Sequence, residues 1–156
     1  MNNIIIVGIG NPYRGDDGAG WAVIQQLEKS INPKYLRKSQ GDIGELLEIF
    51  ACYKHVYIVD ACLATQAGSW RRIDALKEVF PTERQTSTHG LTLSQTIDLA
   101  KALHQLPEQL IIYAIAGIFF LMKETLSTSV AQAVDEAAQK IAEEMQACTK
   151  NMSSTI

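Results

Sequence analysis

Two aspartates and one histidine stand at positions where chemistry is expected in an α/β protein. Asp17 lies in the glycine-rich stretch GIGNPYRGDDGAG, Asp60 closes the apolar run HVYIVD, and His89 lies in the polar stretch TSTHGLTL. Two carboxylate oxygens and one imidazole nitrogen leave coordination positions open and suit a borderline divalent metal such as Zn or Ni. Each residue alone also has a plainer interpretation. Asp17 can be a favourable charge at a helix N-terminus, Asp60 a turn former, and His89 a solvated loop side chain.

The glycine-rich stretch has the form of a phosphate-binding loop but the wrong charge. The dinucleotide fingerprint G-x-G-x-x-G fails because Tyr13 stands at its third glycine, and the Gly-Lys-Ser/Thr of a nucleotide-triphosphate loop is absent. Asp16 and Asp17 stand where a phosphate would bind, and like charges repel strongly in a partly desolvated site. Nucleotide binding is therefore disfavoured, and a cation is the better candidate ligand.

Within this stretch, each residue has an expected task. Gly8 and Gly10 are expected to let the chain turn tightly at the strand end, and Asn11 to brace that turn through its amide. Asp17 is expected to bind the cation. Asp16 has two open interpretations, since it can cap the helix that follows or activate a water molecule.

The elements that position these residues alternate between strand and helix. We expect strands over 3–8, 35–39, 55–60, 68–76 and 109–118, and helices over 18–29, 43–53, 91–106 and from Ser127 or Thr128 to about Cys148. This order predicts an α/β three-layer sandwich, with a twisted, mostly parallel sheet, helices on both faces and one antiparallel edge strand over 68–76. In such sheets, functional sites lie beyond the carboxyl ends of the strands, and Gly90, directly after His89, is expected to shape the loop there.

Composition indicates one domain over residues 1–150, with 151–156 as a frayed tail. The chain of 156 residues has a net charge of −3, and its basic residues are neither in excess nor clustered, so nucleic acid is not an expected partner. The longest apolar stretch, over 110–122, is shorter than the roughly 20 residues of a membrane-spanning helix. The apolar segment 4–7 is far too short for a signal peptide, so none is expected. We therefore expect a cytoplasmic protein without a membrane partner.

Two apolar features have alternative interpretations. Cys62, next to the proposed site, is either reactive or a small buried side chain, and the buried interpretation is favoured because free cysteines are commonly core residues. The apolar residues 119–122 (FFLM) are either core or an exposed docking patch, and core is favoured. The three cysteines include no C-x-x-C pair, which argues against a disulfide framework or a zinc ribbon.

The segments GIGNPYRGDDGAG, VDA and THGLTL together resemble the hydrogenase maturation endopeptidases in order, spacing and strand context along nearly the whole chain. The resemblance implies removal of a C-terminal extension from the large-subunit precursor of a [NiFe] hydrogenase, its partner, once nickel has been inserted. It places the family's metal-binding residues on Asp17, Asp60 and His89. The implied cofactor is a divalent metal, nickel carried by the substrate. A metal-bound water is one possible nucleophile, and a water activated by a carboxylate such as Asp16 is the other.

The chain departs from the family pattern in one of its polar segments. Family members tend to carry an acidic residue before the glycines of the next loop, where this chain has Ser39 and Gln40, with Asp42 close by. A second function also remains open at this point. The chain can be a non-catalytic binding module that recognises the metal site of a partner protein without cleaving it.

Overall fold

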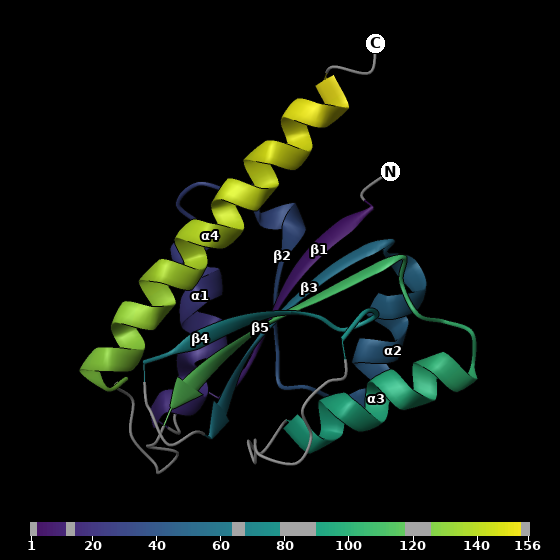
Figure 1. The fold of residues 1–156 in the computed structure, drawn as a ribbon, viewed down its shortest axis with the longest axis horizontal. Coiled ribbons are helices and arrows are strands. Elements are labelled where there is room, and N and C mark those ends of the chain that lie inside the picture. The colour runs from purple at the N-terminus through teal and green to yellow at the C-terminus, as the bar shows by residue number, and fades with distance from the viewer. Residues whose placement is uncertain (1–2, 12–14, 64–67, 79–89, 118–125, 154–156) are drawn as a thin grey trace.

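Five strands and four α-helices make up most of the described chain. The computed structural model describes residues 3–11, 15–63, 68–78, 90–117 and 126–153 (Figure 1). In chain order the elements are β1 (Ile4–Ile9), η1 (Gly15–Gly18), α1 (Ala19–Leu27), η2 (Pro33–Tyr35), β2 (Leu36–Ser39), α2 (Ile43–Cys52), β3 (His55–Leu63), β4 (Trp70–Asp74), α3 (Gly90–Ala102), β5 (Gln109–Gly117) and α4 (Thr128–Ser153), where η marks a short 3-10 helix.

The strands form one sheet in the order β2-β1-β3-β5-β4. β2, β1, β3 and β5 pair in parallel, and β4 pairs antiparallel with β5 at the edge. β1, β3 and β5 are nearly continuous apolar runs because helices cover both of their faces, whereas the edge strand β2 is partly exposed. In β4, at the edge of the sheet, Arg71 and Arg72 are exposed whereas Ile73 is buried. The predicted mixed sheet with one antiparallel edge strand is confirmed.

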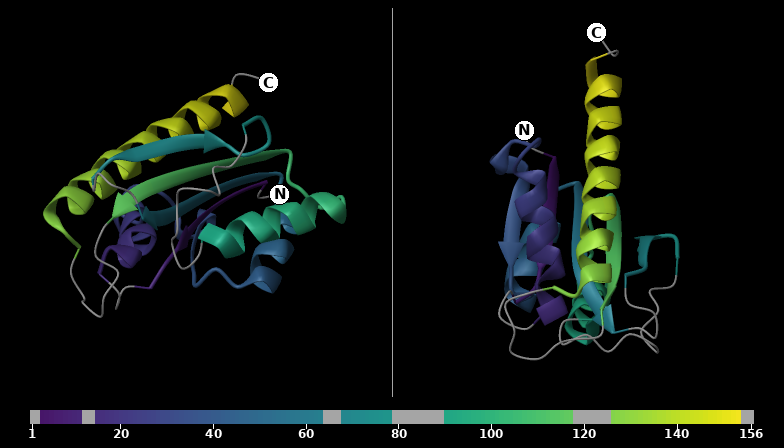
Figure 2. Two further views of the ribbon diagram at one scale, coloured as in Figure 1. Left: turned by 60° about the horizontal axis from the view of Figure 1, so that its bottom comes forward. Right: turned by 90° about the vertical axis from the view of Figure 1, so that its left-hand side faces the viewer.

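The helices form the two outer layers of the sandwich. α1 and α4 pack on one face of the sheet, and α2 and α3 pack on the other (Figures 1 and 2). α1 buries Ala19, Val23 and Leu27, which lie four residues apart and therefore share one stripe of the helix. α4 faces α1 with small side chains, including Ala133 and Ala137, which let the two helices approach closely. The predicted three-layer α/β architecture is confirmed.

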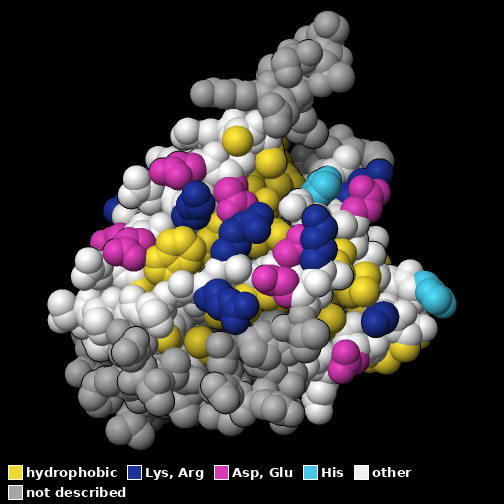
Figure 3. Space-filling model, viewed as in Figure 1, with side chains coloured by type: hydrophobic (Ala, Val, Ile, Leu, Met, Phe, Trp, Pro, Cys, Tyr) yellow, Lys and Arg dark blue, Asp and Glu magenta, His cyan; other side chains and the backbone are white. Residues whose placement is uncertain are grey.

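Several element ends differ from the prediction, and α3 ends at Ala102 rather than at 106. β3 continues beyond Asp60 to Leu63, because β5 extends alongside it and supplies hydrogen-bond partners. α4 continues past Cys148 to Ser153 and projects beyond the sheet (Figure 2). No helix in the described ranges is long and apolar enough to cross a membrane. On the face shown in Figure 3, Lys and Arg side chains are interspersed with Asp and Glu.

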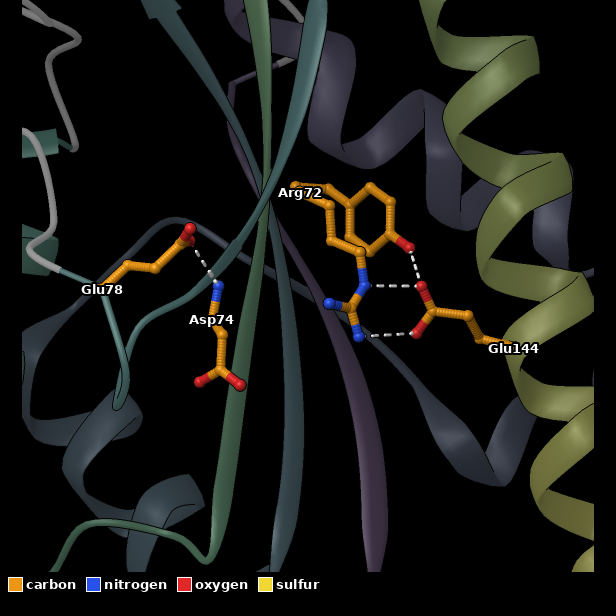
Figure 4. A network of polar contacts seen from close by, with 5 residues as sticks. Arg72, Asp74, Glu78 and Glu144 are labelled. Atoms are coloured by element: carbon orange, nitrogen blue, oxygen red, sulfur yellow. Dashed lines mark hydrogen bonds and ion pairs between the residues drawn. The ribbon is translucent and has the colours of Figure 1, made fainter.

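One carboxylate fastens α4 to the antiparallel edge of the sheet. Glu144 accepts hydrogen bonds from Arg72 Nε at 2.7 Å, from Arg72 Nη2 at 3.3 Å, and from the hydroxyl of Tyr113 (Figure 4). Burial by itself raises the pKa of Glu144, but the hydrogen bonds from Arg72 and Tyr113 outweigh it, and the net pKa is lowered. The carboxylate therefore stays ionised at neutral pH, paired with a guanidinium in the bidentate geometry that favours such pairs.

The lowered pKa of Glu144 predicts a stability contribution that disappears in acid. Because the folded-state pKa lies below the ordinary value of about 4.3, the contribution is complete above that value and is lost as the pH falls through the folded-state pKa. Glu144→Gln is expected to lower the free energy of unfolding by about 1–2 kcal/mol at pH 7, a range reduced for the partial exposure of Arg72.

Urea unfolding at pH 7 and in acid measures this contribution. The difference between the wild type and Glu144→Gln should shrink below about pH 4. Glu143→Gln, which removes an exposed charge from the same turn of α4, is the control and should have little effect. An equal destabilisation by Glu144→Gln at both pH values would contradict the assignment.

Candidate active site at the carboxyl edge of the sheet

The strand order places a topological switch point between β1 and β3. From β1 the chain passes through α1 on one face to reach β2, and from β2 it passes through α2 on the other face to reach β3. In open α/β sheets, ligands bind beyond the carboxyl ends of the strands at such a point. The two segments that flank it here are η1, which follows β1, and the last residues of β3.

Asp60 lies on β3 one residue past the last β1–β3 pair. Gly8 and Val59 form the last β1–β3 pair, whereas β3 stays paired with β5 as far as Leu63. Asp60 was predicted to be the final residue of its strand, but it is the first residue of β3 beyond the pairing with β1. Its side chain is only 5 % exposed, and strand alternation directs it to the face covered by α2 and α3. A strand supported on one side holds this carboxylate in a defined position.

Two glycines let the start of α1 contact the carboxyl edge of the sheet directly. A Cβ atom on Gly20 would lie 2.3 Å from the carbonyl oxygen of Ile9 and 2.6 Å from that of Val59. A Cβ atom on Gly8 would lie 2.4 Å from the carbonyl oxygen of Gly20. These neighbours are backbone atoms and cannot rotate away. Because neither glycine has a side chain, the start of α1 packs directly on the strands. This packing places η1, one turn before Gly20, beside the switch point.

Gly8 and Gly10 were predicted to form a tight turn at the strand end, but the structure gives them other roles. The glycine with a left-handed backbone in this stretch is Gly15, at φ 58°, and neither Gly8 nor Gly10 has a positive φ. Gly8 serves close packing, as described above, and the N–H of Gly10 donates to the carbonyl of Ser39 at 3.0 Å. The bracing role of Asn11 stays a prediction.

Asp16 is bound to the N-terminus of α4. Its Oδ1 accepts the backbone N–H of Ser127 at 2.8 Å, and its Oδ2 accepts the Ser127 hydroxyl at 3.2 Å. The carbonyl of Ser127 in turn accepts the N–H of Ala131 at 2.9 Å, which starts the helix. The expectation that Asp16 caps α1 is wrong, since Gly18 occupies that cap position without a side-chain hydrogen bond. The Asp16 carboxylate instead lies where the dipole of α4 favours negative charge.

Asp17 and His89 are placed by their neighbours along the chain. The backbone of Asp17 belongs to η1, next to Asp16, and its side chain lies outside the described residues. His89 also lies outside them, directly before Gly90, the first residue of α3. α3 begins at the edge toward which β3 and β5 point (Figure 1), and it covers the same face as Asp60. The described chain thus brings the Asp60 side chain, the Asp17 backbone and the start of α3 to one sheet edge.

The donor chemistry at this edge fits a divalent cation. Asp60 offers carboxylate oxygen, and Asp17 and His89 are of types that supply further oxygen and nitrogen donors. Among the side chains that the structure describes, no group of three or more His, Cys, Asp or Glu is arranged to hold a metal. The predicted set of three ligands includes two side chains outside that description, so the set stays a prediction.

Ser39 joins three elements at this edge, although sequence reasoning did not single it out as a site residue. Its carbonyl accepts the N–H of Gly10 at 3.0 Å and the indole N–H of Trp21 at 2.8 Å. Its buried hydroxyl donates to Glu45 Oε2 at 3.0 Å. The contact with Glu45 brings a carboxylate from α2 to the end of β2.

The sequence signal for this contact is the capping pattern Asp42-x-x-Glu45. Asp42 Oδ1 accepts the N–H of Glu45 at 3.0 Å, so Asp42 is the N-cap of α2. This cap sets the first turn of the helix, from which the Glu45 side chain reaches Ser39.

Cys62 is part of the core on the same face as Asp60, which confirms its interpretation as a buried side chain. Burial, and secondly the charge of Asp60, raise the pKa of the Cys62 thiol to about 11. The thiol is therefore protonated at neutral pH and unsuited to act as a nucleophile. The apolar residues 119–122 lie outside the described residues, and both interpretations of that segment stay untested.

The remaining histidines lie outside this arrangement. His55 opens β3 at the opposite edge of the sheet, where its Nδ1 lies 3.2 Å from Gln109 Oε1. His104 is exposed and follows the end of α3. Neither residue belongs to the carboxyl edge.

Fold and site together define a small doubly wound α/β protein with acidic residues at its switch point. A sequence profile of the family described as hydrogenase maturation protease matches residues 40–144. A putative hydrogenase maturation protease of Methanocaldococcus jannaschii is 30% identical over 149 residues, covering 89% of this chain and 94% of the relative. The chain belongs to the hydrogenase maturation protease family.

Solved structures show the same fold. The hydrogenase maturating endopeptidase HybD of Escherichia coli matches with a TM-score of 0.78 and 21% identity, covering 95% of this chain and 94% of that chain. The [NiFe] hydrogenase maturation protease HybD of Thermococcus kodakarensis matches with a TM-score of 0.73 and 22% identity, covering 93% of this chain and 99% of that chain. With the family established from sequence, the protein is a hydrogenase maturation endopeptidase, which processes the C-terminus of a hydrogenase large subunit.

The close contact at Gly20 predicts a strong response to one added methyl group. Gly20→Ala is expected to lower the free energy of unfolding by about 2 kcal/mol or more, because backbone atoms at 2.3 and 2.6 Å must move. Gly44→Ala is the matched control in α2, since its new Cβ would meet only the Asp42 side chain, at 3.2 Å. It should be neutral or slightly stabilising, because alanine is the better helix former. Denaturant unfolding that shows equal effects for the two variants would contradict the packing argument.

Proposed function

We propose that Asp17, Asp60 and His89 form the site at which this endopeptidase recognises nickel in the large-subunit precursor of a [NiFe] hydrogenase. The observation that carries the proposal is the Asp60 carboxylate, buried at the switch point directly past the last β1–β3 pair. The match of the GDDG, VDA and THG segments to the family pattern supports the other two residues. Cleavage then removes the C-terminal extension of the precursor.

In this proposal, the three residues supply different donor atoms from different elements. Asp60 contributes an oxygen donor from a fixed strand, Asp17 one from the turn after β1, and His89 a nitrogen donor from the segment before α3. Three donors leave positions open for the thiolates that carry the metal in the precursor and for the peptide. A divalent metal at this place can polarise the scissile carbonyl and orient the chain for attack by water.

The proposal predicts that cleavage depends on each of the three side chains. Asp17→Asn, Asp60→Asn and His89→Ala are each expected to reduce cleavage by about 100-fold or more, since several kcal/mol of charge stabilisation are lost with a metal contact. The assay follows the mass of a nickel-loaded precursor incubated with each purified variant. Circular dichroism should show the wild-type fold in each case.

Matched controls remove the same chemical groups elsewhere. Asp98→Asn changes an exposed carboxylate on α3. His104→Asn changes an exposed histidine with φ 55°, a backbone conformation that asparagine tolerates. Both should cleave at the wild-type rate. Cleavage at the wild-type rate by any one of the three site variants would contradict the proposed set of three ligands.

Nickel recognition also predicts that loading of the substrate gates the reaction. Precursor without nickel should be cleaved only at background rate, because the three donors then have no metal through which to position the peptide. The comparison uses one precursor preparation divided into nickel-free and nickel-reconstituted halves, with the same enzyme. Equal rates for the two halves would disprove gating while leaving the protease activity in place.

A further inference from the structure

We infer that Asp16 is a positioning residue, whose carboxylate clamps the turn η1 to the N-terminus of α4 and thereby holds the neighbouring Asp17 in place. This inference rests on the metal role proposed for Asp17. It assigns Asp16 a task different from activating water, although the two aspartates are adjacent in the chain.

The clamp joins parts of the chain that are far apart in sequence. Asp16 and Ser127 are separated by 111 positions, yet both carboxylate oxygens of Asp16 accept donors of Ser127, at 2.8 and 3.2 Å. Asp16 is fully buried. The bond to the backbone N–H is a charge-assisted hydrogen bond at a helix N-terminus, one of the stronger types found in proteins.

β5 restrains Asp16 from a second side. A Cβ atom on Gly117, the last residue of β5, would lie 2.6 Å from the Cβ of Asp16 and 3.2 Å from its Oδ2. The Asp16 side chain therefore occupies the space that a side chain at position 117 would need. α4 bound to its oxygens and β5 against its Cβ thus restrain Asp16, and with it η1, from two sides.

The geometry argues against a direct part in catalysis for Asp16. A general base must place an oxygen within hydrogen-bond reach of the attacking water. Both oxygens of Asp16 are directed at Ser127, and the residue has no exposed surface. The backbone of Asp17 follows directly in η1, so any displacement of Asp16 moves the ligand next to it.

Two substitutions at position 16 separate the clamp from a base. Asp16→Asn keeps one oxygen for the Ser127 N–H and gains an amide that can donate to the Ser127 hydroxyl. Asp16→Ala removes both contacts. For a clamp, Asp16→Asn should retain cleavage of the nickel-loaded precursor within about fivefold, and Asp16→Ala should lose about tenfold or more through a lower kcat.

Gly117→Ala tests the same contact without changing Asp16. The added Cβ must displace the aspartate, so cleavage should fall as it does in Asp16→Ala. Ser127→Ala removes only the longer hydroxyl contact and should give an intermediate loss. This milder variant keeps the test decisive even if Asp16→Ala does not fold.

Amide hydrogen exchange supplies a readout independent of activity. Exchange at 15–18 and at 127–131 should accelerate together in Asp16→Ala and Gly117→Ala, and stay near the wild-type rate in Asp16→Asn. Asp42→Ala is the control, because it removes a capping carboxylate from α2 and should leave exchange at 15–18 unchanged.

Two results would overturn the inference. A loss of about 100-fold in Asp16→Asn, equal to that in Asp16→Ala and with wild-type exchange, would make Asp16 a base. Unchanged cleavage by folded Asp16→Ala would reduce the clamp to a contribution to stability. Failure of the proposed metal site would look different: Asp17→Asn would cleave at the wild-type rate. The coupled exchange at 15–18 and 127–131 in the Asp16 variants would be unaffected by that result, so failure of the metal site and failure of the clamp are distinguishable.

Discussion

The direct contact between the start of α1 and the carboxyl edge of the sheet is the constraint on which the site depends. Gly20 lies against the carbonyl oxygens of Ile9 and Val59 at distances that no side chain permits. This contact fixes η1 beside β3 and thus sets the separation between the turn after β1 and Asp60. A glycine-rich loop here serves close packing of backbone on backbone, in a place where related architectures use it to approach phosphate.

Two carboxylates hold α4 in place, one from η1 and one from α4 itself. Near its N-terminus, it binds Asp16 from η1 through Ser127. Farther along, its own Glu144 binds Arg72 of β4 and Tyr113 of β5. Both carboxylates are removed from water to a large extent, and both are compensated by charge-assisted or multiple hydrogen bonds. The helix that closes the fold on the α1 side therefore also supports the turn that carries the proposed metal ligand.

Ser39 connects several elements at the same edge. Its hydroxyl contacts Glu45 of α2. Its carbonyl also binds Gly10 and Trp21, so β2, the loop after β1 and α1 meet at one residue. The carboxylate thus comes from the next element in the chain, and the packing around it is maintained by backbone groups.

Sequence by itself determined the layer architecture, the mixed sheet, the edge strand and the family, because these follow from apolar periodicity and from short motifs. It also indicated the edge at which Asp60 lies. Only the tertiary structure decided that β3 runs past Asp60, that Gly8 serves helix–strand contact, and that Asp16 binds Ser127 rather than capping α1. The physical reason is that local patterns report neighbours within a few residues, whereas these three features depend on elements brought together by packing across the sheet.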